Sequence, residues 1–234
     1  MRCTSILLAA TFLLTGNFAA TAQMKSCCDP EGTKLLSTVK QTAGTLRMAK
    51  ILDSINRYCN PEDFMVMNAE KVDLIKKKLA VEKDANKRFN LYFQYATESL
   101  NAGNIEESVN VLKQMLAASK LTNENFPPQY KPLFDQLAIA YMRRGEQENC
   151  AANHNPESCI IPIQGNGIHK LTSGSEQAIE VYKSILTKFP DDLQSRYLLN
   201  VAYMTLGKYP AEVPARLATA AHHLTRNRDS RQCR

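Results

Sequence analysis

The sequence predicts an all-α protein, built as a short right-handed superhelix of stacked antiparallel helix pairs. Apolar residues recur at spacings of three and four along most of the 234 residues, which is the period of an amphipathic helix. No segment shows a convincing period-two pattern; Ile160, Ile161 and Ile163 come nearest, but Pro162 argues against a central strand. The hydrophobic fraction of 44% is typical of a folded chain.

The N-terminus has the layout of a secretory signal peptide. Met1-Arg2 precedes an apolar run from Ile6 to Leu14, and Ala20-Thr21-Ala22 forms a small-residue cleavage site. The apolar run is too short to span a bilayer. We therefore expect residues 1–22 to be removed and the mature chain to be exported, either to the periplasm or to the medium.

Residues 23–84 are expected to form an N-terminal helical segment. A helix is predicted over 33–58, where Gly44 leaves open whether it is one long helix or two shorter ones. Asn60 then supplies a capping side chain, followed by a proline and two acids, which is the pattern of a helix start. From this start, the helix is predicted to run through Phe64, Met67, Val72, Ile75 and Leu79.

Residues 85–215 are expected to contain paired helices, each ended by a turn. We expect Gly145 and Gly207 to end two of these helices, and Ser175 to cap the helix that follows the inserted loop 146–174. The predicted helices of this part cover 85–100, 105–119, 130 or 132–144, 175–189 and 193–206.

An internal pattern in these helices resembles the tetratricopeptide repeat (TPR). Tyr141 and Gly145 repeat the step of Tyr203 and Gly207, and Ser99 and Gly103 are a weaker copy. The residues that carry the resemblance most clearly are Ala178, Tyr182, Ile185, Pro190, Tyr203, Gly207 and Tyr209. The resemblance implies that small residues let paired helices approach and that glycines end helices with positive φ.

The inserted loop points to one particular group of proteins that carry such repeats. Gly145 and Gly207 are separated by one repeat of about 34 residues plus about 28 more. The chain over about residues 85–215 is similar to the repeat leader of exported bacterial proteins that continue into FG-GAP or VCBS β-propeller repeats and an ASPIC/UnbV module. The residues that carry this likeness are 145–150, 154–163, 174–175 and 197–210. No propeller follows here, and we expect a truncated or frameshifted reading frame from about residue 217, leaving 216–234 as a basic irregular tail.

The cysteines favour disulfides, because the chain is expected to be exported. Cys3 leaves with the signal peptide, and nearness in sequence predicts that Cys150 pairs with Cys159. The pairing of the other cysteines stays open; these are Cys27, Cys28, Cys59 and Cys233. An alternative is a metal site, since Cys150, His154, Cys159 and His169 are ligands that suit zinc or copper. Their spacing is not that of a zinc finger, and we expect no cofactor.

Charge and motifs disfavour two classes of function. The net charge of +6 is concentrated in the tail 216–234, which has five arginines against one aspartate, so the folded part lacks the basic face of a nucleic-acid-binding protein. No nucleophile, phosphate-binding or zinc-protease motif appears. We therefore expect a protein that is not an enzyme.

Binding of a protein or peptide on the concave surface of the stacked helices is the function that this pattern favours. Each candidate contact residue can equally be an ordinary solvated position. Alternatives are a structural leader that packs on a β-propeller and a metal-binding module built on the inserted loop. The candidate contact residues lie on the first helix of each pair: Asn90, Gln94, Gln136, Arg143, Arg196, Asn200 and Met204.

Overall fold

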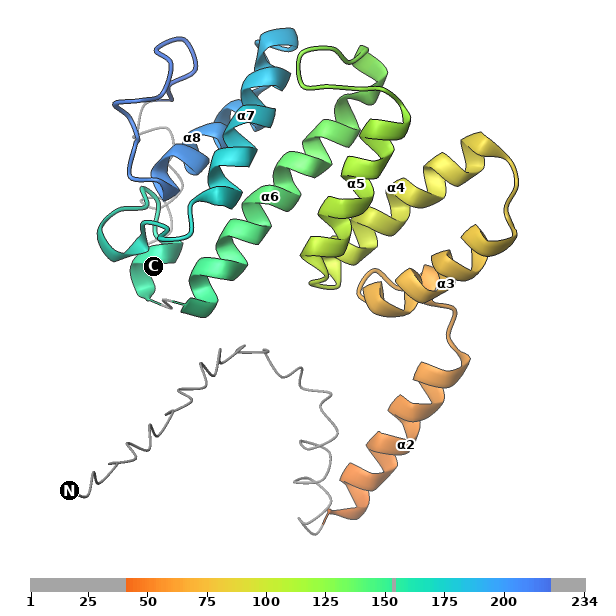
Figure 1. Ribbon diagram of the computed structural model, residues 1–234. Helices are drawn as coiled ribbons and strands as arrows, with labels where there is room; N and C mark the ends of the chain where they lie inside the picture. Colours follow the sequence, from red (N-terminus) through yellow and green to blue (C-terminus); the bar gives the residue numbers. More distant parts are fainter. Residues whose placement is uncertain (1–40, 153–154, 220–234) are drawn as a thin grey trace, which may run out of the picture. The chain divides into compact units, whose positions relative to one another are not determined.

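A computed structural model describes residues 41–152 and 155–219, and within them the protein is all-α (Figure 1). The described residues contain seven α-helices and no strand, which confirms the predicted fold class. The helices are α2 (Ala43–Tyr58), α3 (Asn68–Val81), α4 (Ala85–Asn101), α5 (Ile105–Ala118), α6 (Lys131–Ala152), α7 (Ser173–Lys188) and α8 (Leu193–Thr205). Short 3₁₀ helices cover Pro61–Asp63, Pro128–Tyr130, Pro156–Cys159 and Gly165–Gly167. No helix in the described ranges combines the length and apolarity that crossing a membrane requires.

Contacts divide the chain into two units, Met1–Ile51 and Leu52–Arg234. In the second unit, α3 to α8 follow one another as antiparallel neighbours, each packed on the next (Figure 1). This arrangement of stacked helices is consistent with a helical repeat. Helix α2 begins at Ala43, so Gly44 lies in its first turn and does not interrupt the helix within the described residues.

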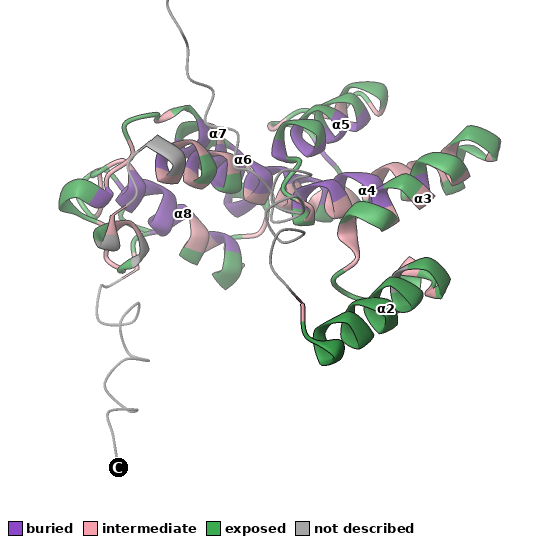
Figure 2. Ribbon diagram, turned by 90° about the horizontal axis from the view of Figure 1, so that it is seen from below, coloured by how far each residue is buried: buried purple, intermediate pink, exposed green. Residues whose placement is uncertain are grey.

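The core of the second unit lies between consecutive helices, which are buried on their facing sides (Figure 2). Leu112, Phe134 and Ile185 are completely buried, and the ring of Phe126 stacks on that of Phe134 with centroids 3.9 Å apart. Phe126 comes from the loop between α5 and α6. That loop therefore contributes to the core although it contains two prolines.

The predicted starts of two helices, α3 and α7, are wrong. Asn60 does cap a helical turn, because its side chain accepts from the Glu62 N–H, but this turn is a separate 3₁₀ helix. Phe64 is extended and interrupts the predicted helix, so α3 begins at Asn68 and not directly after Asn60. Ser175 does not cap α7 either, since the helix begins at Ser173 and the Ser175 side chain is buried inside its first turn.

The glycines at the ends of helices behave as predicted in two cases out of three. Gly103 and Gly207 have φ values of 84° and 68°, in the left-handed region that favours glycine. Gly145 does not end its helix: α6 continues for two more turns to Ala152, and Gly145 lies buried within it. The prediction that the helix stops at Gly145 is therefore wrong.

Gly145 and Gly174 instead let α6 and α7 approach until their backbones touch. A Cβ on Gly174 would lie 2.6 Å from the Gly145 backbone nitrogen, 2.7 Å from its Cα and 2.8 Å from the Tyr141 carbonyl oxygen. These are backbone atoms of a helix, which cannot rotate away as a side chain could. The crossing of α6 and α7 therefore requires glycine at position 174.

We predict that Gly174→Ala destabilises the protein by about 1–3 kcal/mol, the usual cost of overpacking a close contact. Urea unfolding measures the change. Gly44→Ala is the matched control, because the nearest atom to its Cβ is Thr42 Oγ1 at 3.8 Å. Equal stability of the two variants would contradict the proposed constraint.

Candidate functional site

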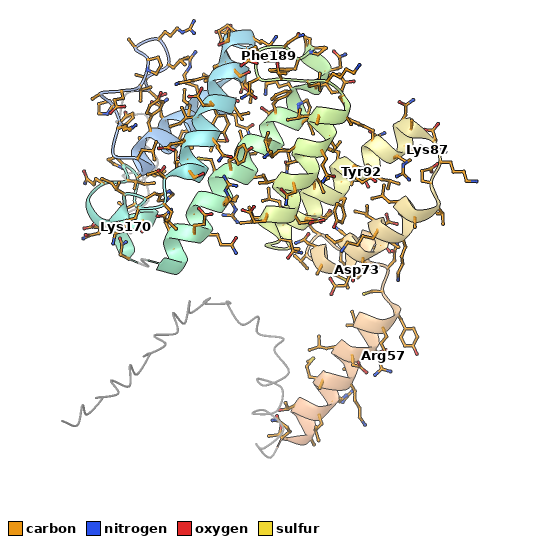
Figure 3. The ribbon with its side chains drawn as sticks, in the orientation of Figure 1. Arg57, Asp73, Lys87, Tyr92, Lys170 and Phe189 are labelled. Atoms are coloured by element: carbon orange, nitrogen blue, oxygen red, sulfur yellow. The ribbon has the colours of Figure 1, made fainter. Side chains whose placement is uncertain are left out.

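The inserted segment returns to α6 and is held there by the side chain of Asn149. The Asn149 Nδ2 group donates to the Leu171 carbonyl at 2.9 Å, while its Oδ1 accepts from the backbone N–H groups of Lys170 and Leu171 at 2.8 and 3.0 Å. Asn149 is 8% exposed, so water competes little for these bonds. Figure 3 labels Lys170 at this point of the chain.

Asn200 on α8 holds a second non-helical segment in the same manner. Its Nδ2 group donates to the Leu217 carbonyl at 2.8 Å, and its Oδ1 accepts from the Thr219 N–H at 3.0 Å. Both asparagines also donate to the carbonyl four residues earlier in their own helix. In two places, therefore, an asparagine within a helix hydrogen bonds to the backbone of a non-helical segment.

A second set of bonds fixes the end of the inserted segment between α7 and α8. The His169 N–H donates to the Thr205 carbonyl at 2.8 Å, and the His169 Nδ1 lies 3.1 Å from Ser175 Oγ. Ser175 Oγ in turn accepts from Thr205 Oγ1 at 2.7 Å. Because Ser175 is 1% exposed, this serine and histidine pair cannot reach a substrate and serves to dock the segment.

Burial lowers the pKa of His169, and the nearby Glu146 carboxylate opposes that shift only in part. The neutral imidazole is therefore the form that fits the docked segment. This statement about protonation applies to His169 only, because His154 lies outside the described residues.

The predicted metal and disulfide sites fall largely outside the part of the chain that the structure describes. His154, Cys27, Cys28 and Cys233 lie outside it, and so does the side chain of Cys159. The Cys150 to Cys159 disulfide therefore stays a prediction. In the described ranges no three His, Cys, Asp or Glu side chains gather to hold a metal ion.

Two of the predicted contact residues, Asn90 and Gln94, lie together in a groove between α3 and α4. Both side chains are exposed, and neither is hydrogen bonded within the described residues. The hollow has a volume of about 440 Å³, and Gln94 also lines an adjoining hollow of about 180 Å³. The larger hollow is lined by Lys78, Val81, Glu82, Lys87, Asn90, Leu91 and Gln94.

The other predicted contact residues are not brought into this groove. Gln136 is half-buried on α6, Arg143 pairs with Glu146 on its own helix, and Arg196 donates to the Pro190 carbonyl. Two more are buried, Asn200 completely and Met204 to 1% exposure, which removes both from the set of residues that a partner can touch. Asn200 faces inward because its side chain bonds to the backbone of Leu217 and Thr219.

An ion cluster joins the start of α6 to the start of α8. The Lys131 ammonium lies 2.8 Å from Asp135 Oδ2 and 2.6 Å from Asp192 Oδ2. Burial lowers the pKa of Lys131, but the bonds to both carboxylates outweigh it and raise that pKa. Asp192 also caps α8 by accepting from the N–H groups of Gln194 and Ser195. Through these bonds the cluster holds the start of α6 against the start of α8.

Comparison with protein-family models, curated proteins and solved structures gives no match for this chain. The inference of function therefore depends on the geometry of the sites described above.

We predict that Asn149→Ala destabilises the protein by about 1–3 kcal/mol, because it removes three part-buried hydrogen bonds to the backbone of Lys170 and Leu171. Hydrogen exchange at these two amides should accelerate with it. Asn110→Ala on the exposed face of α5 is the control. If both variants unfold at the same urea concentration, Asn149 does not hold the segment.

We predict that lowering the pH destabilises the protein through His169, at the end of the inserted segment. Since the pKa of His169 is lower in the folded protein than its usual value of 6.5, the unfolded chain takes up a proton first as the pH falls. Stability that is fully present at about pH 7.5 should therefore be partly lost at about pH 5. Thermal unfolding of the protein and of His169→Gln checks this: the variant should lose less on acidification, and an identical loss would contradict the assignment to His169.

Proposed function

We propose that this protein is an exported, non-enzymatic helical scaffold that binds an extended peptide segment of a partner in the groove between α3 and α4. The observation that carries the proposal is the pair Asn90 and Gln94, whose side-chain amides face the groove without a hydrogen-bond partner in the described chain. Each amide offers both a donor and an acceptor. That combination matches the N–H and C=O groups of a peptide backbone.

The spacing of the two amides suits an extended chain. Residues four apart on a helix are separated by about 6 Å along its axis. Alternate residues of an extended peptide repeat every 6.6–6.8 Å or so. A segment lying along α4 can therefore present one peptide group to Asn90 and the peptide group two residues later to Gln94.

The protein uses the same chemistry on its own backbone. Asn149 and Asn200 each pair with a carbonyl and an N–H group of a non-helical segment, at distances of 2.8–3.0 Å. At Asn90 and Gln94 the amides point outward and no segment of the described chain covers them. We infer that an outside segment takes that place.

The rest of the groove gives limited selectivity. Leu91 and the 77%-exposed Val81 offer an apolar surface, which favours a partner with an apolar side chain facing the groove. Lys87 projects from the start of α4 and forms no ion pair among the described residues (Figure 3). Because the groove would bind mainly the backbone of the peptide, peptides of many different sequences should fit it.

Assignment to the TPR family and to exported leaders is part of the proposal. The antiparallel helix pairs and the positive φ values of Gly103 and Gly207 support the repeat assignment. The signal-like residues 1–22 support export.

The test uses peptides selected from a random extended library on the purified mature chain, with affinity measured by fluorescence anisotropy. We predict that the double variant Asn90→Ala/Gln94→Ala weakens binding about 10-fold to 100-fold, because it removes two to four hydrogen bonds of about 0.5–1.5 kcal/mol each. The matched control is Asn110→Ala/Gln114→Ala, the same two residue types at the same spacing on the exposed face of α5. This control should bind normally.

Equal loss in both double variants, or selection of peptides that bind elsewhere, would contradict the proposal. Unfolding curves should show both variants to be as stable as the original protein, since all four side chains are exposed.

A further inference from the structure

A second groove of the protein lies on α6, between α5 and α7. Helix α6 packs on α5 at one side and on α7 at the other, and both run antiparallel to it (Figure 1). The three helices and the loop between α5 and α6 form a hollow of about 470 Å³, which we call the α5–α7 groove. It shares no lining residue with the two hollows of the α3–α4 groove.

The floor of the α5–α7 groove is apolar. Leu137 and Tyr141, one turn apart on α6, line it together with Val181 of α7, and these three residues are 3%, 7% and 2% exposed. On the α5 side, Leu116 and Leu121 are still partly exposed to solvent. Apolar side chains of an occupant would gain free energy by covering this surface.

The two rims of the groove carry opposite charge. Glu176 and Glu180 lie one turn apart on α7, and Lys113 lies on α5. All three are exposed. Glu180 bonds to Lys183 at 3.0 Å, whereas Glu176 and Lys113 form no ion pair among the described residues. The groove therefore offers one unpaired charge of each sign, on opposite rims.

The groove has few free hydrogen-bonding groups for the backbone of an occupant. The Gln177 side chain already donates to Ser173 Oγ, and Thr122 Oγ1 accepts from the Asn125 N–H. An extended peptide would bury backbone N–H and C=O groups here without partners, which costs free energy. A helix bonds these groups internally and presents only its side chains. The lining therefore favours a helix, in contrast to the α3–α4 groove with its exposed amides.

We propose that the α5–α7 groove binds an amphipathic helix of a partner protein, with apolar side chains on the floor, a basic side chain beside Glu176 and an acidic side chain beside Lys113. The lining of α7 runs from Glu176 to Val181, about 7.5 Å along the helix axis. Apolar side chains at positions i and i+4 of the partner cover that length. The inference is independent of the peptide site between α3 and α4.

Two synthetic peptides of equal helicity test the proposal, with affinity for the purified mature chain measured by fluorescence anisotropy. Both carry leucines at i, i+3, i+4 and i+7 as one face. The first peptide has lysines along one edge of this face and glutamates along the other, and the second has glutamates along both edges. The first peptide should bind about 3-fold to 10-fold more tightly, because only it can pair with Glu176.

Variants of the acidic rim show whether this preference arises in the groove. Glu176→Gln/Glu180→Gln should remove the preference for the first peptide. Glu70→Gln/Asp73→Asn is the matched control, because it neutralises two exposed acids on α3 outside the groove, and it should keep the preference.

A bulky side chain in the hollow tests the apolar contact. Ala117→Trp should weaken binding of the first peptide about 10-fold or more, because it occupies the space that the leucines need. Ala118→Trp is the matched control, since Ala118 is the next exposed alanine of α5 and does not line the groove. All substituted side chains of this and the rim variants are exposed, so unfolding curves should match that of the original protein.

Four results would overturn the proposal: no binding of either peptide, equal affinity for both, equal loss in the two tryptophan variants, or loss of binding in Asn90→Ala/Gln94→Ala. The last result would place the peptide in the α3–α4 groove. Sedimentation of the mature chain should show single copies. Dimers that Ala117→Trp dissociates would assign the groove to a second copy and also overturn the proposal.

Discussion

The contact between the backbones of α6 and α7 at Gly145 and Gly174 determines the arrangement around it. A Cβ at position 174 would collide with three backbone atoms, so the two helices cross at the closest distance that glycine permits. This crossing buries Ser175 at the start of α7, within reach of His169 and Thr205. The end of the inserted segment is therefore fixed in place, although the segment itself is irregular.

Side-chain amides attach two of the non-helical segments to helices. Backbone N–H and C=O groups that belong to no helix still require partners when they are buried. Asn149 and Asn200 supply such partners from within helices, and the exchange is favourable because both asparagines are shielded from water. The exposed pair in the α3–α4 groove has the same chemistry but competes with water, so a partner must add apolar contact to bind there.

Partly buried charges fix the start of α6 to the start of α8. Lys131 lies between Asp135 and Asp192 and offsets part of their negative charge, and Asp192 also caps α8. Burial raises the pKa of Asp135 in spite of Lys131. The bonds of the two carboxylates to Lys131, and of Asp192 to the first turn of α8, make the cluster a structural connection between helices.

The sequence by itself determined the all-α class, most helix limits, and the glycines at positions 103 and 207, because helical periodicity and positive φ are local properties. It also named Asn90 and Gln94 as candidate contact residues from their position on a helix, which stays a prediction. Tertiary contacts decided the rest: α6 continues through Gly145 because α7 packs against it there, and Asn200 faces inward because its side chain bonds to the backbone of Leu217 and Thr219. Neither effect leaves a periodic trace in the sequence, since each depends on which distant segment arrives at that surface.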